Sequence, residues 1–243
     1  MSFPTVIYGP ASLRWETHTT QRRPLGTQLV IPDGRKFRYA RAGATALVVG
    51  DLLQAPANTA NHVNLTPAIT AVNSLTPTVA VGATAVVVDE YARGLFVVSV
   101  TPGAGLAYEI LSNPVNAGSA DMVVTLAPGN AIQTALTATS RVDLIRHPYS
   151  AVIQHPTTRT GIAVGVAQVA LAIDAYGWVQ THGLCAVLTE GTVILGNMVI
   201  PSASTAGGVA PQGAATYIAP AIGRVQRVAA TAAWSTIFLE IDG

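Results

Sequence analysis

The pattern of hydrophobic and polar positions predicts a chain built from short β-strands. In residues 36–39, charged side chains alternate with aromatic rings, and Ile237, Leu239 and Ile241 fall on one face near the end of the chain. Period-two alternation is typical of strands with one buried face. The continuous apolar runs 85–88 and 95–98 predict strands buried on both faces. Turn residues recur about every 8–12 positions, which indicates an all-β fold, either a β-barrel or a β-sandwich.

Two segments also fit helical patterns. Apolar residues at 166, 169, 170 and 173 have the i, i+3, i+4, i+7 spacing of a helix, but flanking glycines and β-branched residues favour a strand there. Residues 131–139 follow Asn130, a good N-cap residue, and predict a single helical turn or none. No repeat with a period of about 20–50 residues is evident, which disfavours a propeller or a solenoid.

The order of these segments predicts three parts. Residues 1–33 contain four prolines and no sustained periodicity, so we expect an extended N-terminal arm that orders only against another surface. Residues 34–60 together with 159–243 are expected to form the main β domain, a barrel or a sandwich. Residues 61–158 are rich in threonine and are expected to form an inserted second β domain.

Charge is scarce along the whole chain. Of the 243 residues, 10% are charged, and 13 Lys and Arg against 12 Asp and Glu leave a net charge of +1. Soluble domains usually contain about 25% charged residues. A free nucleic-acid binder would need a clustered basic patch, and a disordered tail would need a charged run, so both classes are disfavoured. The shortage of charge indicates that much of the surface is covered in an assembly.

A membrane partner is also disfavoured. Residues 52–88 and 191–223 lack any charge, but Pro, Gly, Asn and Thr interrupt both stretches. Neither stretch holds the roughly 20 mainly apolar residues that a membrane span requires. The first residues do not place a basic segment before an apolar run, so we expect no secretory signal.

The sequence contains none of the common catalytic motifs. There is no phosphate-binding loop and no Gly-x-Ser-x-Gly elbow, and the five histidines lack the spacing of a local zinc site. The single cysteine, Cys185, lies among apolar neighbours and is expected to be a buried, inert thiol. We therefore expect no enzyme, no catalytic residue, no metal ligand and no cofactor.

Two groups of side chains are candidates for contacts with a partner. The expected arm carries bulky side chains and a pair of arginines, which can bind carboxylates through two hydrogen bonds each. Its candidates are Phe3, Tyr8, Trp15, Arg22 and Arg23. The second group, Tyr176, Trp178 and His182, would share one face of a strand. This face is either a ligand platform or a packed, subunit-facing strand.

Several loose glycine and apolar motifs resemble virion structural proteins of tailed bacteriophages, and in particular capsid decoration (cement) proteins. The resemblance spans roughly residues 32–243, and its motifs are 32–43 with 46–53, 91–98 with 103–110, and 176–183 with 196–202 and 223–225. It implies a β-barrel or sandwich that binds the major capsid protein on the capsid exterior and stabilises the shell. We expect a non-enzymatic homo-oligomer, with a trimer favoured, that is made in the host cytoplasm.

Other functions stay open at this point. The protein could be a tail, baseplate or minor capsid component of the virion. It could also be a virion hydrolase or carbohydrate-binding module, for which Tyr176, Trp178 and His182 would form the platform.

Overall fold

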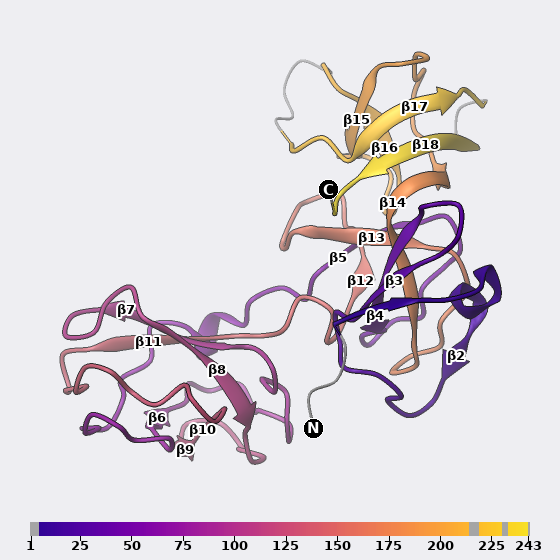
Figure 1. The fold of residues 1–243 in the computed structure, drawn as a ribbon. Coiled ribbons are helices and arrows are strands. Elements are labelled where there is room, and N and C mark those ends of the chain that lie inside the picture. Colours follow the sequence, from indigo (N-terminus) through magenta and orange to yellow (C-terminus); the bar gives the residue numbers. More distant parts are fainter. Residues whose placement is uncertain (1–4, 214–218, 230–232, 243) are drawn as a thin grey trace. The chain divides into compact units, whose positions relative to one another are not determined.

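The chain is all-β, as the sequence predicts. A computed structural model describes residues 5–213, 219–229 and 233–242 (Figure 1). Within these ranges there is no α-helix, and the only helical segments are the 3₁₀ turns η1 (Ala11–Trp15) and η2 (Ala60–His62). The chain divides into two compact units, one formed by residues 1–56 and 148–243 and the other by residues 57–147.

The first unit contains one branched twelve-stranded sheet. Its main path runs in the order β1 (Val6–Tyr8), β3 (Gln28–Val30), β4 (Lys36–Arg41), β14 (Tyr176–Leu188), β18 (Trp234–Glu240), β17 (Gly223–Arg227), β15 (Met198–Pro201) and β16 (Val209–Pro211). The branch consists of β2 (Thr17–His18), β5 (Leu52–Gln54), β12 (Ile153–Gln154) and β13 (Ala163–Ala167), and β2 and β13 both pair with β14.

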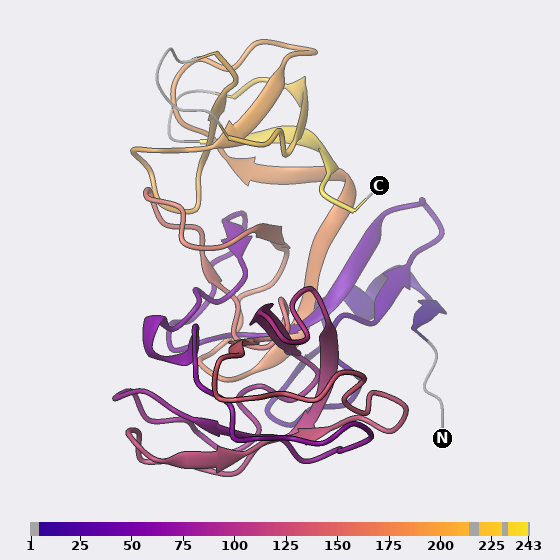
Figure 2. The ribbon, with the colours of Figure 1, turned by 90° about the vertical axis from the view of Figure 1, so that its left-hand side faces the viewer.

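The long strand β14 joins the two halves of this sheet and bends between them (Figure 2). Its first half pairs with β4 and its second half with β18, and the register with β4 shifts between Gln180 and His182. Gly183 follows with a φ of +87°, which glycine adopts at little cost. The buried Gln180 side chain donates hydrogen bonds to the carbonyl oxygens of His182 (3.0 Å) and Leu184 (2.9 Å). These bonds satisfy backbone acceptors at the bend.

Residues 5–33 are part of this sheet, which differs from the expected separate arm. Strand β1 pairs in parallel with β3, and β3 pairs with β4 across a hairpin whose turn contains Gly34 at a φ of +85°. The hairpin places Leu29 and Ile31 in one apolar cluster with Phe37 and Trp178. Ile7, Leu13 and Leu25 of the same segment also pack against this cluster, so the segment shares its core with the neighbouring strand.

The second unit has its own apolar core. Its strands are β6 (Thr78–Ala80), paired with β9 (Asp121–Val123), and a four-stranded sheet in the order β10 (Thr125–Leu126), β8 (Ala107–Ser112), β7 (Leu95–Val100) and β11 (Arg141–Ile145). The sequence placed an insertion at 61–158, whereas the compact unit covers 57–147. The following residues belong to the first unit, because β12 pairs with β5.

Some local predictions were wrong. Residues 95–98 do form a strand, β7, but only one face is buried, since Phe96 and Val98 are inaccessible while Leu95 is exposed. Residues 85–88 form part of a turn with Val87 and Val88 exposed. Residues 131–139 contain no helical turn, which is one of the two outcomes that the sequence left open. The predicted strand near residue 166 is present as β13, and it ends at Ala167.

Leu29→Ala should destabilise the protein strongly, because Leu29 is completely buried in the first unit. We expect the free energy of unfolding to fall by about 2–5 kcal/mol, measured by urea denaturation. Val6→Ala on the exposed β1 is the control and should cost well under about 1 kcal/mol. Equal, small effects at both positions would mean that residues 5–33 behave as a loose arm.

A bidentate ion pair ties the end of β18 to β4. Arg38 Nε and a terminal guanidinium nitrogen lie 2.6 and 2.9 Å from the two Asp242 carboxylate oxygens, and Gln28 Nε2 on β3 donates a further bond of 3.2 Å. The hydrogen bonds from Arg38 are the main reason why the pKa of Asp242 lies below its usual value. The carboxylate therefore stabilises the fold in its charged form.

Asp242→Asn should lower stability in a pH-dependent way. A depressed carboxyl pKa adds stability that is complete above the unfolded-state pKa and is lost as the pH falls through the folded-state pKa. The gap in unfolding free energy between wild type and Asp242→Asn should therefore be largest at neutral pH and shrink as the pH falls below about 3.8. Asp174→Asn, which breaks the exposed pair with Arg41, is the control and should change stability little. A pH-independent gap would contradict this role of Asp242.

Candidate functional site: exposed apolar turns

Six β-turns of the described residues share one geometry, and we call them the tip turns. Each begins with a buried residue, exposes the next two residues, and closes with a hydrogen bond of 3.0–3.3 Å from the fifth N–H to the second carbonyl. Three lie in the first unit and three in the second. The tip turns are residues 47–51, 70–74, 86–90, 136–140, 171–175 and 193–197.

The sequence favours this geometry at one position above all. The fourth residue has a positive φ in five of the six turns, and it is Gly50, Asn73, Asp89, Asp174 or Gly196. Glycine, asparagine and aspartate tolerate this left-handed conformation best. The last four residues of each tip turn form the β-turn itself, so the fourth residue of the tip turn is the third residue of that β-turn. A β-turn with positive φ at its third residue is of type II. The buried first residue of the tip turn anchors it to the core.

In each unit, two of the three tip turns are joined to each other. Leu47 and Leu171 in the first unit exchange two backbone hydrogen bonds, and Thr70 and Leu136 do the same in the second. The sequence also repeats, because residues 43–51 and 82–90 both begin Gly-Ala-Thr-Ala and both contain Val-Val at the exposed positions. Both units therefore contain the same turn motif.

Sequence reasoning missed this repeat. An apolar run such as 85–88 also fits a buried strand, and that interpretation hid the turn. The signal that could have revealed it is the recurrence of two apolar residues followed by Gly, Asn or Asp.

The exposed positions of the tip turns are mostly branched apolar residues. Val48, Val49, Val72, Val87, Val88, Ile173, Ile194 and Leu195 are between 46% and 66% exposed. Single exposed apolar residues are normal on a protein surface. Adjacent pairs held at the ends of the turns form small apolar patches instead. Larger contiguous apolar patches are typical of interaction sites.

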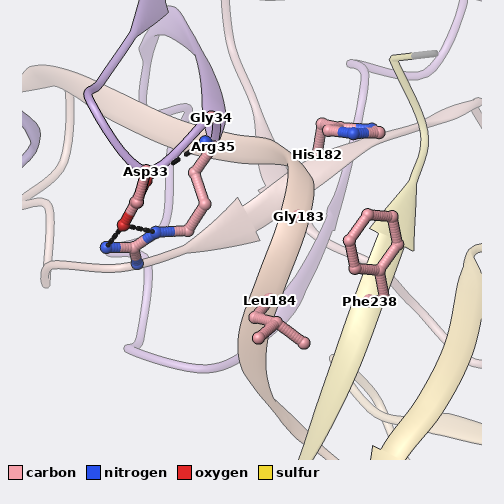
Figure 3. Close-up of a pocket in the computed structure, with 7 residues that line it drawn as sticks. All are labelled: Asp33, Gly34, Arg35, His182, Gly183, Leu184 and Phe238. Carbon is pink, nitrogen blue, oxygen red and sulfur yellow. Dashed lines mark hydrogen bonds and ion pairs between the residues drawn. The ribbon is translucent and has the colours of Figure 1, made fainter.

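A cavity of about 350 Å³ lies beside the bend of β14 in the first unit (Figure 3). Arg35 forms an ion pair with Asp33 at 2.8 Å on one side, and the His182 ring meets the Phe238 ring edge-on, with ring centres 5.2 Å apart, on the other. The hydrogen bond from Arg35 lowers the pKa of Asp33. Leu184 adds an exposed apolar wall. The cavity thus offers apolar contact and a neutralised ion pair, which suits binding of a side chain.

The candidate contacts from the sequence are scattered over the first unit. Tyr8 on β1 is 83% exposed, and Trp15 at the end of η1 is half exposed with the Arg14 guanidinium 4.3 Å from its ring centre. Arg22 is exposed, whereas Arg23 lies 5.8 Å from the Trp178 ring centre and helps to cover it. Phe3 lies outside the described residues.

The proposed platform of Tyr176, Trp178 and His182 does not form on the surface. Trp178 is completely buried against Tyr39, with ring centres 5.1 Å apart, because its strand face packs onto the cluster that contains Leu29 and Phe37. Tyr176 stacks on Tyr39, and only His182 reaches a cavity. The packed-strand alternative therefore describes Trp178.

Two of the potentially reactive side chains are held in uncharged forms. Cys185 is buried, and burial raises its pKa to about 12, so the thiol keeps its proton. Burial also lowers the pKa of His147 to about 4 and keeps that ring neutral. In the part of the chain that the structure describes, no three His, Cys, Asp or Glu side chains are grouped to hold a metal ion.

Comparisons with known proteins give no further guide. No known protein family, no curated protein and no solved structure matches the chain. None of the described helices is long and apolar enough to cross a membrane.

Gly50→Ala tests whether a tip turn is held rigidly. Gly50 and Gly34 have the same φ of +85°, but a Cβ at Gly50 would fall on the Trp234 ring, whereas a Cβ at Gly34 meets nothing within 4 Å. Gly34→Ala should cost about 1–2 kcal/mol from the backbone alone. Gly50→Ala should cost clearly more and shift the tryptophan fluorescence. Equal costs, measured by urea denaturation, would show that the turn yields freely.

Proposed function

We propose that this protein is a structural component of a tailed-phage virion that binds the major capsid protein on the outside of the head and stabilises the shell. The observation that carries this proposal is the set of exposed apolar tip turns in both units. The resemblance of residues 32–243 to capsid decoration proteins supports it from the sequence side.

The physical mechanism is adhesion at several points. Burying apolar surface contributes roughly 25 cal/mol per Å², so a pair of valines at one tip gives only a weak contact. Several tips on one molecule, multiplied by a homotrimer, convert weak contacts into firm attachment through effective concentration. A chain with only 10% charged residues meets little electrostatic resistance when it approaches such a surface.

The part assigned to residues 1–33 changes under this proposal. Because β1 and β3 belong to the sheet, residues 5–33 contribute contacts as a fixed surface, through exposed Tyr8 and half-exposed Trp15, and have no need to order on binding. A fixed surface avoids the entropy cost of ordering an arm.

A tail, baseplate or minor capsid position would use the same adhesive surface, so the location in the particle separates these alternatives. A carbohydrate-binding module has less support, because burial of Trp178 removes the aromatic platform on which that alternative depended.

Replacing the valines of one tip tests the proposal. Val87→Thr with Val88→Thr keeps the shape of both side chains and adds hydroxyl groups, and both positions are exposed, so folding should change little. We expect affinity for shells of the cognate major capsid protein to fall roughly tenfold in a co-sedimentation assay.

The matched control is Val115→Thr with Val123→Thr in the same unit. These valines are also exposed but lie outside the tip turns, and their replacement should leave binding unchanged. Failure of the wild-type protein to bind shells would contradict the capsid proposal. An equal loss of affinity in both double variants would contradict the role of the tip turns.

A further inference from the structure

The tip turns 47–51 and 86–90 both end in an acidic residue, and the two acids are held in different ways. In the second unit, Glu90 forms an ion pair with Arg146 and accepts a hydrogen bond of 2.9 Å from the Val87 N–H. In the first unit, Asp51 is buried, at 4% exposure. The only described group that donates a hydrogen bond to its carboxylate is the Gln154 amide, at 2.6 Å. A cation therefore neutralises one acid and not the other.

Residues 202–208, which we call the covering turn, close over Asp51. Gly207 lies directly against the carboxyl, since a Cβ there would fall 2.7 Å from Asp51 Cγ. Two backbone hydrogen bonds hold the covering turn in this position. The Leu52 N–H donates to the Gly207 carbonyl oxygen at 2.7 Å, and the Gly207 N–H donates to the His155 carbonyl oxygen at 2.8 Å. The closed covering turn thus keeps Asp51 away from water.

The surroundings of Asp51 offer it no compensating positive charge from any described residue. The covering turn and β13, which pack against the tip turn, contain no titratable residue. On the side of β12, burial lowers the pKa of His155 and so disfavours a charged ring. Glu190 accepts a hydrogen bond from the first residue of the covering turn, Ser202, and would add only negative charge.

These surroundings favour the neutral form of Asp51. Burial is the main reason why the pKa of Asp51 lies above its ordinary value of 3.8, and the hydrogen bond from Gln154 offsets only part of this effect. A raised carboxyl pKa adds stability that is complete below the unfolded-state pKa and is lost as the pH rises through the folded-state pKa. Opening of the covering turn would let water reach the carboxyl and return its pKa towards the ordinary value.

We propose that the covering turn is a pH-dependent lid on the tip turn 47–51, which the neutral Asp51 carboxyl keeps closed and which opens more readily once Asp51 is ionised. Opening breaks the hydrogen bond between Leu52 and Gly207, and Leu52 directly follows the tip turn. The tip turn 86–90 keeps its ion pair under the same conditions, so the two units respond differently to pH. The lid depends on the fold alone, whether or not the protein binds a capsid.

Hydrogen exchange measured by NMR tests the lid at its own amides. In the wild type, the protection factors of the Leu52 and Gly207 amides should fall as the pH rises from below about 3.8 to neutral. The expected fall is about tenfold for each unit by which the folded-state pKa is raised. Asp51→Asn keeps the shape of the side chain and cannot ionise, so both amides should stay protected. The control amide is Val142 in the second unit, and it should be equally protected in both proteins.

Urea denaturation gives an independent readout with a matched variant of opposite sign. Asp51→Asn should raise the urea midpoint at neutral pH and match the wild type below about pH 3.8. Glu90→Gln removes an acid at the same position of the other turn, and it should lower the midpoint at neutral pH because Arg146 loses its partner. Gln154→Met removes the one donor to Asp51 and should steepen the loss of stability with rising pH.

Two results would overturn the lid. One is an Asp51→Asn protein that is no more stable than the wild type at neutral pH. The other is a gain in stability while the protection of the Leu52 and Gly207 amides follows the wild type at every pH, because the effect would then arise away from the covering turn.

Discussion

The bend of β14 is the constraint on which the first unit depends. One strand of thirteen residues pairs with β4 before the bend and with β18 after it, so both halves of the sheet meet along a single segment. The bend is possible because Gly183 adopts a positive φ and because the buried Gln180 side chain donates to the carbonyl oxygens of His182 and Leu184. Any side chain at position 183 would also meet Arg35, since a Cβ there would lie 2.8 Å from Arg35 Cγ.

The sheets hold the tip turns in place, which suits these turns to the adhesion that we propose. Each tip is anchored by a buried residue, and two pairs of turns hold each other through reciprocal backbone bonds. Because the exposed side chains are fixed before binding, little conformational entropy is lost when they meet a partner. His62 reinforces one of them, with its ring nitrogens 2.5 Å from the Tyr91 hydroxyl and 2.9 Å from the Thr84 carbonyl oxygen, just before the turn at 86–90.

How much could be predicted from the sequence depended on the kind of signal. The alternating residues 36–39 lie in β4, and Ile237 and Leu239 lie in β18, because period-two patterns have one simple solution. The run 85–88 became a turn, because local apolar content does not separate a buried strand from an exposed tip. The sequence left Trp178 open as part of a ligand platform or of a packed strand, and the pairing of β14 with β4 shows that its face is covered. The contact of the covering turn with Asp51 joins distant segments of the chain and could not be read from spacing at all.

We propose, as the central claim, that this protein attaches to a virion through apolar turns on a β scaffold. A cryo-EM map of the intact particle tests it most directly. The account predicts density for this chain on the outside of the head, with tip turns such as 47–51 and 86–90 buried against the major capsid protein. A particle that lacks the chain, or one in which every tip turn faces solvent, would contradict it.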